Sequence, residues 1–271
     1  MTHMIWLKQL IYGLASGLAA CFPISMEAHQ DILATIFGFR QRQPLLQLLI
    51  DAACLLALVV GCAGDWRRLH EARGGNREAV AAQNRMTLTM LRTALVPMLV
   101  TLVLTRWWGR QLSGLLVLCL FLVINGVVLV IPQQLRIGNR DARTLNPLAA
   151  FGLGLAGGLA GFSGLSCVAA MLCVALALGV SRTNALSYTY LLYIPGMLVW
   201  LLLDGLELAG GMETVSVMVG LRYALTVLCA YAGSSIAIMT MRSLSVKAGF
   251  TSFAFYSWGA AMLAMILYLM T

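Results

Sequence analysis

The sequence predicts an all-α integral membrane protein built as an inverted-topology repeat, with one re-entrant helix pair and three transmembrane helices in each half. The first reason is composition, because 61% of the 271 residues are hydrophobic and only 10% are charged. A chain with so few polar groups needs a membrane as its solvent. The second reason is that runs of about 20 apolar residues recur, the length that crosses a bilayer. The third is an internal repeat.

The repeat consists of two segments rich in small residues, 13–25 and 154–166. Seven of their 13 positions are identical at a constant offset of 141. Interrupted apolar segments at corresponding places in two half-chains indicate a binding site near the membrane midplane, between the repeats. The alternative is chance, because glycine, leucine and alanine are abundant in any membrane helix.

The first half, residues 1–132, opens with an apolar segment over 4–37 that Pro23 and a group of polar side chains interrupt. A helix that faces lipid does not tolerate these groups, whereas a re-entrant pair shielded by protein does. We therefore predict a re-entrant pair here. Three transmembrane spans follow, over about 45–63, 86–105 and 112–131.

The second half, residues 147–271, repeats this layout after a basic linker over 133–146. Its first segment, 147–180, is glycine-rich and apolar, and we predict a second re-entrant pair there. The remaining spans are predicted over about 182–203, 215–239 and 250–270.

The charges of the loops predict how the protein lies in the membrane. Basic loops over 65–85, 133–146 and 241–249 belong in the cytoplasm by the positive-inside rule. The acidic loop over 204–213 then lies outside, together with both termini, and the two halves have opposite orientation. One segment disagrees: the tryptophan-containing turn 106–110 carries two arginines and falls outside, where we interpret it as an interfacial anchor.

Charge and cysteine content exclude other classes of protein. The net charge of +8 comes from loops, so it reports topology and contact with lipid headgroups rather than nucleic-acid binding. The seven cysteines lie mostly within apolar runs, without a Cys-x-x-Cys motif or zinc-ligand spacing. We interpret them as small apolar side chains and predict no metal site from them.

Several short motifs occur in an order that is specific, although no single motif is. They are Gly13-Leu14 through Phe22-Pro23-Ile24-Ser25 with His29, then Trp66-Arg67-Arg68-Leu69, Gly179-Val180-Ser181-Arg182 and Phe253-Ala254-Phe255-Tyr256. In this arrangement the chain resembles the undecaprenyl-pyrophosphate phosphatases (UppP, also called BacA) over nearly its whole length. The resemblance implies a bacterial inner-membrane protein of cell-envelope and peptidoglycan synthesis that handles a polyprenyl lipid carrier.

The chain departs from this family at the charged positions. The family's Glu-x-x-x-Glu falls on Ser16 and Ala20. The arginine of its second motif, Pro-Gly-x-Ser-Arg-Ser-Gly, falls on Cys167 or, with a shifted alignment, on Gly164. An arginine that the family carries in its last span is Ser257 here. The chain is therefore a divergent member with degenerate catalytic motifs.

These losses bear on hydrolysis. Cleaving a pyrophosphate needs cations for the charge that develops on the transferred phosphoryl group. It also needs a carboxylate that activates the nucleophile or holds a metal. Four such losses together predict that hydrolysis has relaxed and that the protein is a pseudoenzyme.

The remaining polar residues in apolar surroundings are the candidate site, because ionisable groups inside a membrane are costly and usually functional. Plain alternatives stay open: solvated groups at the outer interface for the acidic residues, a positive-inside anchor for Arg182, and close helix packing for the small serines. The candidate ligand-binding residues are Ser25, Glu27, His29, Asp31, Asp51, Ser163, Ser166 and Arg182.

Three hypotheses of function follow. The first is a non-hydrolytic protein that binds undecaprenyl phosphate or a related lipid and, in its fuller form, translocates it with proton coupling through the acidic cluster. The second is an active undecaprenyl-diphosphatase that uses His29 with Glu27, Asp31 or Ser25. It would need a divalent metal, whereas the first needs no cofactor. What discriminates them is whether an arginine reaches the cavity. The third is an accessory lipid-binding subunit of an envelope-glycan machine. Apart from lipids, the expected partner is a second copy of the chain in a homodimer or a member of such a machine.

Overall fold

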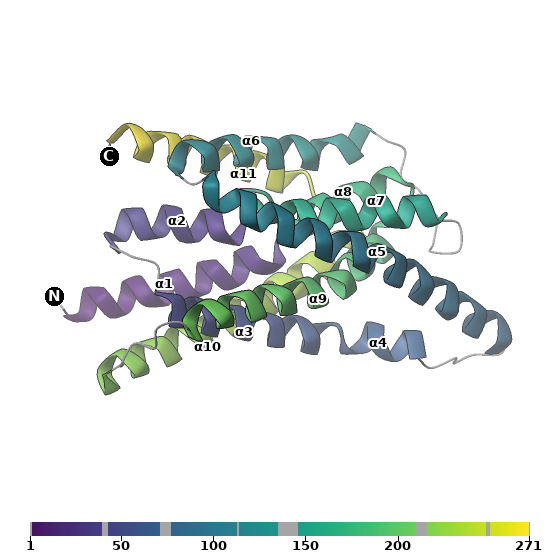
Figure 1. The fold of residues 1–271 in the computed structure, drawn as a ribbon, viewed down its shortest axis with the longest axis horizontal. Helices are drawn as coiled ribbons and strands as arrows, with labels where there is room; N and C mark the ends of the chain where they lie inside the picture. The colour runs from purple at the N-terminus through teal and green to yellow at the C-terminus, as the bar shows by residue number, and fades with distance from the viewer. Residues whose placement is uncertain are drawn as a thin grey trace.

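The structure is a computed structural model, and it describes residues 2–39, 43–70, 77–112, 114–134, 146–209, 216–247 and 250–270. Within these residues the chain folds into eleven α-helices and short 3-10 turns, so the predicted all-α class is confirmed. The helices run roughly along one long axis and form an elongated bundle (Figure 1).

The first half of the chain contains six of these helices. They are α1 (Thr2–Cys21), α2 (Met26–Phe37), α3 (Pro44–Gly61), α4 (Ala63–His70), α5 (Arg77–Gln111) and α6 (Leu115–Val130), and the 3-10 turn η1 (Ile131–Gln134) follows α6.

The second half contains the other five. They are α7 (Pro147–Gly158), which continues into the 3-10 turn η3 (Leu159–Gly161), then α8 (Cys167–Ala177), α9 (Arg182–Ala209), α10 (Val217–Lys247) and α11 (Ser252–Met270).

Six of the described helices, α1, α3, α5, α9, α10 and α11, are long and apolar enough to cross a membrane. At 1.5 Å per residue, 18 to 20 residues cover the roughly 30 Å of bilayer hydrocarbon. The protein is therefore a multi-pass membrane protein. The helices α6, α7 and α8 are apolar but shorter. The helix α2 has only 12 residues and carries several polar side chains.

This set of spans differs from the expected one at two places. The helix α1 is continuous over Met4–Cys21, and this stretch is long and apolar enough on average to cross by itself, so a re-entrant pair over 4–37 has no support here. The polar residues that suggested it all lie after the end of α1. The segment predicted to span 112–131 forms the 16-residue helix α6.

The repeated small residues bring backbones together. In α1, Gly13 and Gly17 lie against the backbone carbonyls of Thr226 and Ala230 on α10, where a side chain would collide. In the second half the equivalent of Gly13, at position 154, lies against the backbone of α5 in the same way. Each copy of the repeat therefore provides a close helix contact, as small residues do in membrane bundles.

Replacing Gly17 with alanine should lower the melting temperature of the purified protein in detergent. The new methyl group meets the Ala230 carbonyl, and such overpacking costs about 1–3 kcal/mol, which outweighs the roughly 1 kcal/mol gained in helix propensity. The matched control is Gly152→Ala in α7, where a Cβ meets open space and the melting temperature should hold or rise. Equal shifts in both variants would contradict this packing.

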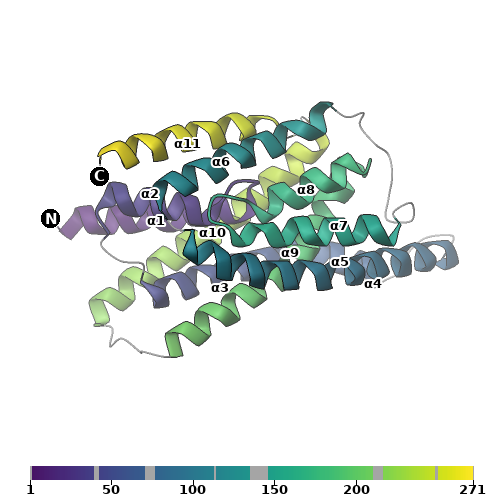
Figure 2. The ribbon, with the colours of Figure 1, turned by 45° about the horizontal axis from the view of Figure 1, so that its top comes forward.

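The contacts between the two halves are repeated as well. The helix α1 packs on α10 as α7 packs on α5, and the equivalent helices α3 and α9, and α6 and α11, contact each other. The start of α1 and the end of α11 lie at one end of the bundle, and the end of α4 and the starts of α5 and α7 lie at the other (Figures 1 and 2). The inverted repeat, and the side of the membrane on which each end lies, stay predictions.

Candidate functional site

Two short helices begin close together inside the bundle. The connector after α1 contains Pro23 and ends at Ser25, whose hydroxyl caps α2 by accepting a hydrogen bond from the Ala28 amide at 3.4 Å. At the equivalent place in the repeat, Ser166 caps α8 by accepting from the Ala169 amide at 3.2 Å. A serine at this position satisfies one of the amides that the first turn of a helix leaves unpaired.

The two connectors are tied to each other. The Gly164 amide donates to the Ser25 hydroxyl at 3.1 Å, across the two halves. From α6, Asn125 donates to the Pro23 carbonyl at 3.1 Å and accepts from the Ser166 amide at 3.0 Å. The first turns of α2 and α8 are thereby held together as one unit.

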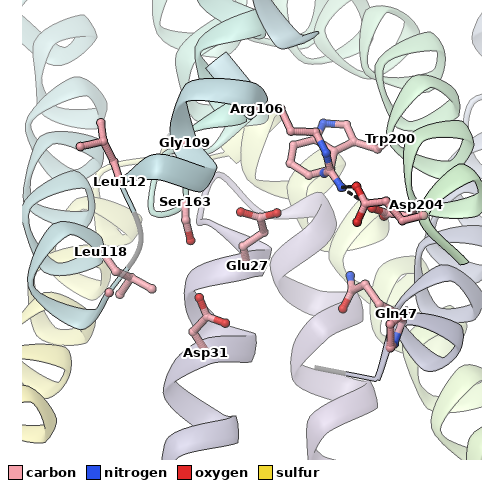
Figure 3. A pocket seen from close by; sticks show the side chains of 14 residues that line it. Glu27, Asp31, Gln47, Arg106, Gly109, Leu112, Leu118, Ser163, Trp200 and Asp204 are labelled. Carbon is pink, nitrogen blue, oxygen red and sulfur yellow. Dashed lines mark hydrogen bonds and ion pairs between the residues drawn. The ribbon is translucent and has the colours of Figure 1, made fainter. Parts of the chain in front are cut away.

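Beside these helix ends lies a cavity of about 450 Å³. Glu27 and Asp31 project into it from α2, Ser163 borders it from the connector before α8, and Arg106 lies across it on α5 (Figure 3). A smaller cavity of about 90 Å³ adjoins it and shares Glu27 and Arg106. Both helix N-termini contribute to its wall through Ser25, Met26, Ser166 and Cys167.

Among the described residues that line the two cavities, Arg106 is the one cation. Its guanidinium pairs with Asp204, lies 3.8 Å from Glu207 and stacks on the ring of Trp200 at 4.0 Å from the centroid. Its side chain is only 13% exposed. The Nε of Arg106 is buried and has no hydrogen-bond partner among the described residues, and the same holds for the Oγ of Ser163.

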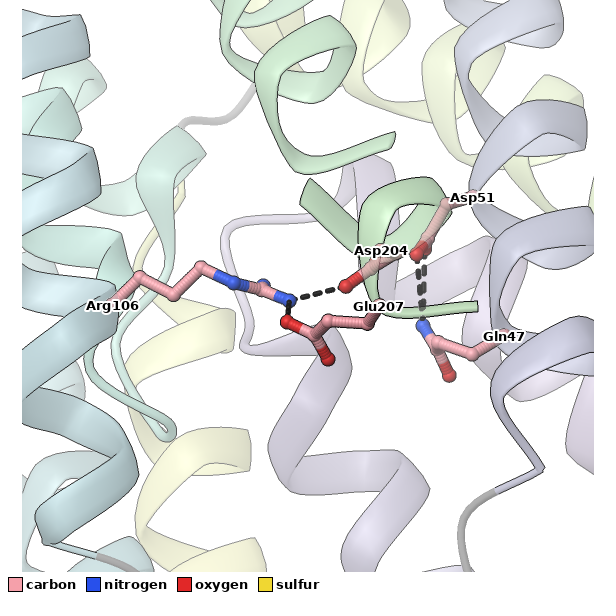
Figure 4. A network of polar contacts seen from close by, with 5 residues as sticks. All are labelled: Gln47, Asp51, Arg106, Asp204 and Glu207. Atoms are coloured by element: carbon pink, nitrogen blue, oxygen red, sulfur yellow. Dashed lines mark hydrogen bonds and ion pairs between the residues drawn. The ribbon is translucent and has the colours of Figure 1, made fainter. Parts of the chain in front are cut away.

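A second polar group continues this network on α3. Gln47 donates to both carboxylate oxygens of Asp51 at 3.1 Å (Figure 4). The side chains of Asp51 and Asp204 lie next to each other in Figure 4, and both line the smaller cavity. The network therefore joins α3, α5 and α9 on one wall of the cavity.

His29 lies on α2, a helix too short to span the membrane. Its Nδ1 donates to the Ser25 carbonyl at 2.6 Å, its Nε2 accepts from the Tyr256 hydroxyl at 3.0 Å, and its ring stacks on that of Tyr256. Burial lowers the pKa of His29 below its ordinary value, so the imidazole is neutral at pH 7. His29 therefore stabilises the capping residue of α2 through its contact with the Ser25 carbonyl. It does not line either cavity.

Comparisons with known proteins agree with this architecture. A family model described as "Bacitracin resistance protein BacA" matches residues 9–263. The chain belongs to the BacA family. Undecaprenyl-diphosphatase 1 of Bacillus cereus is 28% identical over 258 residues, which are 92% of this chain and 93% of that protein. Undecaprenyl-diphosphatase 3 of Bacillus anthracis is 29% identical over the same shares, and the undecaprenyl-diphosphatase of Novosphingobium aromaticivorans is 27% identical over 264 residues.

The positions at which this member of the BacA family departs from the family motifs lie in or beside the site. Ala20 and Cys167, two positions at which the resemblance places charged residues, line the smaller cavity. Ser16 is buried and donates to the Tyr12 carbonyl, while Ser257 accepts from Asn125. Gly164 has a φ of +107°, a conformation that side chains rarely adopt, so it suits the turn rather than an arginine.

The structure brings most of the predicted site residues together. Glu27, Asp31 and Ser163 line the larger cavity, and Ser25, Asp51 and Ser166 line the smaller one. Arg182 is not brought to either. It begins α9, whereas Asp204 lies 22 residues further along the same helix, about 33 Å away at the α-helical rise.

Arg106, Trp200 and Asp204 were not among the predicted site residues. From the sequence, Arg106 was interpreted as part of an interfacial turn and Asp204 as the start of an acidic loop. In this BacA family member α5 runs to Gln111 and α9 runs to Ala209, so all three lie within helices that face each other. One signal was present: the segment with Arg106 was the only exception to the positive-inside rule, and the acidic partner lay on the same predicted side.

Proposed function

We propose that this protein hydrolyses undecaprenyl pyrophosphate, or a closely related polyprenyl pyrophosphate, to the lipid monophosphate and inorganic phosphate. One observation carries the proposal: an arginine, Arg106, reaches the cavity at which α2 and α8 begin. Whether any cation lies there was the criterion that separates hydrolysis from binding alone. The matched relatives are named undecaprenyl-diphosphatases, which supports the same conclusion.

The anionic end of the lipid is bound mainly by main-chain groups in this proposal. Helix N-termini carry unpaired amides and a partial positive charge, and they bind phosphate well. Two of them open beside the same cavity, capped by Ser25 and Ser166. The Arg106 guanidinium adds a full charge for the transferred phosphoryl group.

The carboxylates of α2 supply the acid–base chemistry. Glu27 and Asp31 are four residues apart, so both face the cavity from one side of the helix. Glu27 accepts the proton of a water whose oxygen attacks the terminal phosphorus, while the bridging P–O bond breaks and the lipid monophosphate leaves. The neutral His29 holds the first turn of α2 through the Ser25 carbonyl and acts as a positioning residue.

The donor set also fits a divalent cation that arrives with the substrate. Mg²⁺ commonly uses one or two carboxylates together with phosphate oxygens and waters. Glu27 and Asp31 offer such a pair, whereas the described residues hold no cluster of three or more His, Cys, Asp or Glu side chains for a resident metal. When bound, such a cation neutralises the charge that develops on the phosphates.

The expectation that the protein is not an enzyme has no support in the comparisons. Non-hydrolytic binding or transport of undecaprenyl phosphate stays as the second candidate function. Its specific support is that Ala20 and Cys167 line the smaller cavity. At these two positions the resemblance places charged residues, and this chain has uncharged ones. An accessory role in a larger machine remains a hypothesis without such support.

Phosphate release from undecaprenyl pyrophosphate by the purified protein in detergent tests the proposal. We expect release with Mg²⁺ present, a fall of at least about tenfold with EDTA, and recovery when Mg²⁺ is returned. If EDTA leaves the release unchanged, the divalent cation has no part in the proposed mechanism, and the carboxylates act without it. No release at all, with saturable binding of undecaprenyl phosphate, would favour the second candidate.

A further inference from the structure

Arg106 is held by two carboxylates of the opposite half of the chain. It comes from α5, and its partners Asp204 and Glu207 come from α9 (Figure 4). Only its Nη2 is engaged in these contacts. The Trp200 ring supports the flat face of the guanidinium, so the group can turn within its plane without losing that stacking.

The unpaired atoms of the site point to a ligand that the protein does not supply. The Nε–H of Arg106 is a buried donor without a described partner, and the Ser163 hydroxyl is another. Both residues line the larger cavity, from α5 and from the connector before α8 (Figure 3). Two donors at one cavity suit an anion with several acceptor oxygens, such as a phosphate.

The carboxylates around Arg106 oppose this ligand. Asp204 and Glu207 neutralise the guanidinium, and Asp204 also lies next to Asp51. An anionic substrate must therefore compete with the protein's own carboxylates for the same cation. A pyrophosphate, which carries more charge than a monophosphate, competes better.

We propose that Arg106 exchanges partners during the reaction cycle, held by Asp204 and Glu207 in the unliganded protein and transferred to the pyrophosphate, together with the Ser163 hydroxyl, when the lipid binds. This inference rests on the proposed function for the chemistry of the ligand. After cleavage the monophosphate holds Arg106 less strongly, the two carboxylates recover it, and the product is released. The ion pair thus makes the site selective for pyrophosphate over monophosphate.

An exchange of partners predicts opposite effects for the two members of the ion pair. Removing Arg106 takes away a ligand of the phosphate and weakens binding. Removing the charge of Asp204 takes away the competitor and strengthens binding. An ion pair that only stabilises the fold predicts weaker binding, or none, for both.

The test measures the affinity of the full-length protein in detergent for farnesyl methylenebisphosphonate, whose P–C–P bridge cannot be hydrolysed, and for farnesyl monophosphate. For the bisphosphonate we expect a loss of at least about tenfold in Arg106→Gln, the range of one charge-assisted hydrogen bond, and a gain of about threefold or more in Asp204→Asn. The double variant should bind like Arg106→Gln. Asp204→Asn should also discriminate less between the two probes.

Two further variants guard against misfolding. Glu207 is 47% exposed, so Glu207→Gln should fold normally and tighten binding by a smaller factor than Asp204→Asn. The matched control is Arg242→Gln, which breaks the ion pair of Arg242 with Asp65. Neither member of that pair lines the cavities described above, so the control should bind both probes like the wild type.

Weaker binding in both Asp204→Asn and Glu207→Gln would overturn the exchange, and so would unchanged binding in Arg106→Gln. These outcomes are separate from the fate of the proposed hydrolysis. A wild type that releases no phosphate but shows the opposite-sign pattern would reject the phosphatase and keep the exchange. If the wild type hydrolyses the lipid while Asp204→Asn and Glu207→Gln bind the bisphosphonate more weakly, the phosphatase is kept and the exchange is rejected.

Discussion

Glu27→Gln should lower the rate of phosphate release from undecaprenyl pyrophosphate by about 100- to 10,000-fold, the usual contribution of general acid–base catalysis. The amide keeps the size of the side chain and removes its ability to accept a proton. Glu27 lies in the first turn of α2 and lines both cavities. Asp204 also lines both cavities, but it comes from α9 and is paired with Arg106. Binding of the non-hydrolysable bisphosphonate should change much less than the rate.

The matched control for this variant is Glu78→Gln. Glu78 lies in the first turn of α5, at the end of the bundle opposite the termini, and is exposed. Its release rate should equal that of the wild type. If Glu27→Gln retained more than about a tenth of the wild-type rate, Glu27 would not be the general base, and Asp31→Asn would be the next variant to measure.

Asn125→Ala should cause the largest loss of stability among single substitutions in α6. The Asn125 side chain is almost fully buried and ties the Pro23 carbonyl and the Ser166 amide together. Its loss leaves two buried backbone groups without partners, at about 1–3 kcal/mol each. The melting temperature in detergent should fall by several degrees, and phosphate release should fall with it because the two helix ends separate.

Asn84→Ala is the control for that experiment. Asn84 also donates one hydrogen bond to a backbone carbonyl, that of Arg68, but this bond is exposed to solvent. Its removal should change the melting temperature by less than a degree or two, as expected for exposed substitutions. An equal shift in the two variants would mean that Asn125 does not clamp the site.

The fold class could be predicted because a membrane protein needs a largely apolar composition and apolar runs long enough to cross the bilayer. The end of α1 could not be located as well, because polar residues that follow a helix look the same in sequence as polar residues that interrupt one. The short helix Met26–Phe37 carries Glu27, His29 and Asp31. These residues could be predicted as site residues because ionisable side chains are costly inside a membrane and are usually functional there.

The candidate site was predicted where its residues follow one another, belong to the repeat or, like Asp51, carry charge inside a predicted span. Ser25 and Ser166 could be matched through the constant offset of the repeat, and the structure has both as helix caps. The pairing of Arg106 with Asp204 joins positions 98 residues apart, through the facing of two long helices. Residue spacing contains no information about such a contact, so the arginine appeared to be an anchor.

The two capped helix starts have a consequence for how this chain can diverge. Amides of the main chain are present whatever the side chains are, so a binding site made from them is inherited with the backbone path. Ala20 and Cys167 line the smaller cavity with uncharged side chains, and those amides are still in place beside them. In the proposed site, the charged side chains can therefore differ between family members while the main-chain donors stay the same.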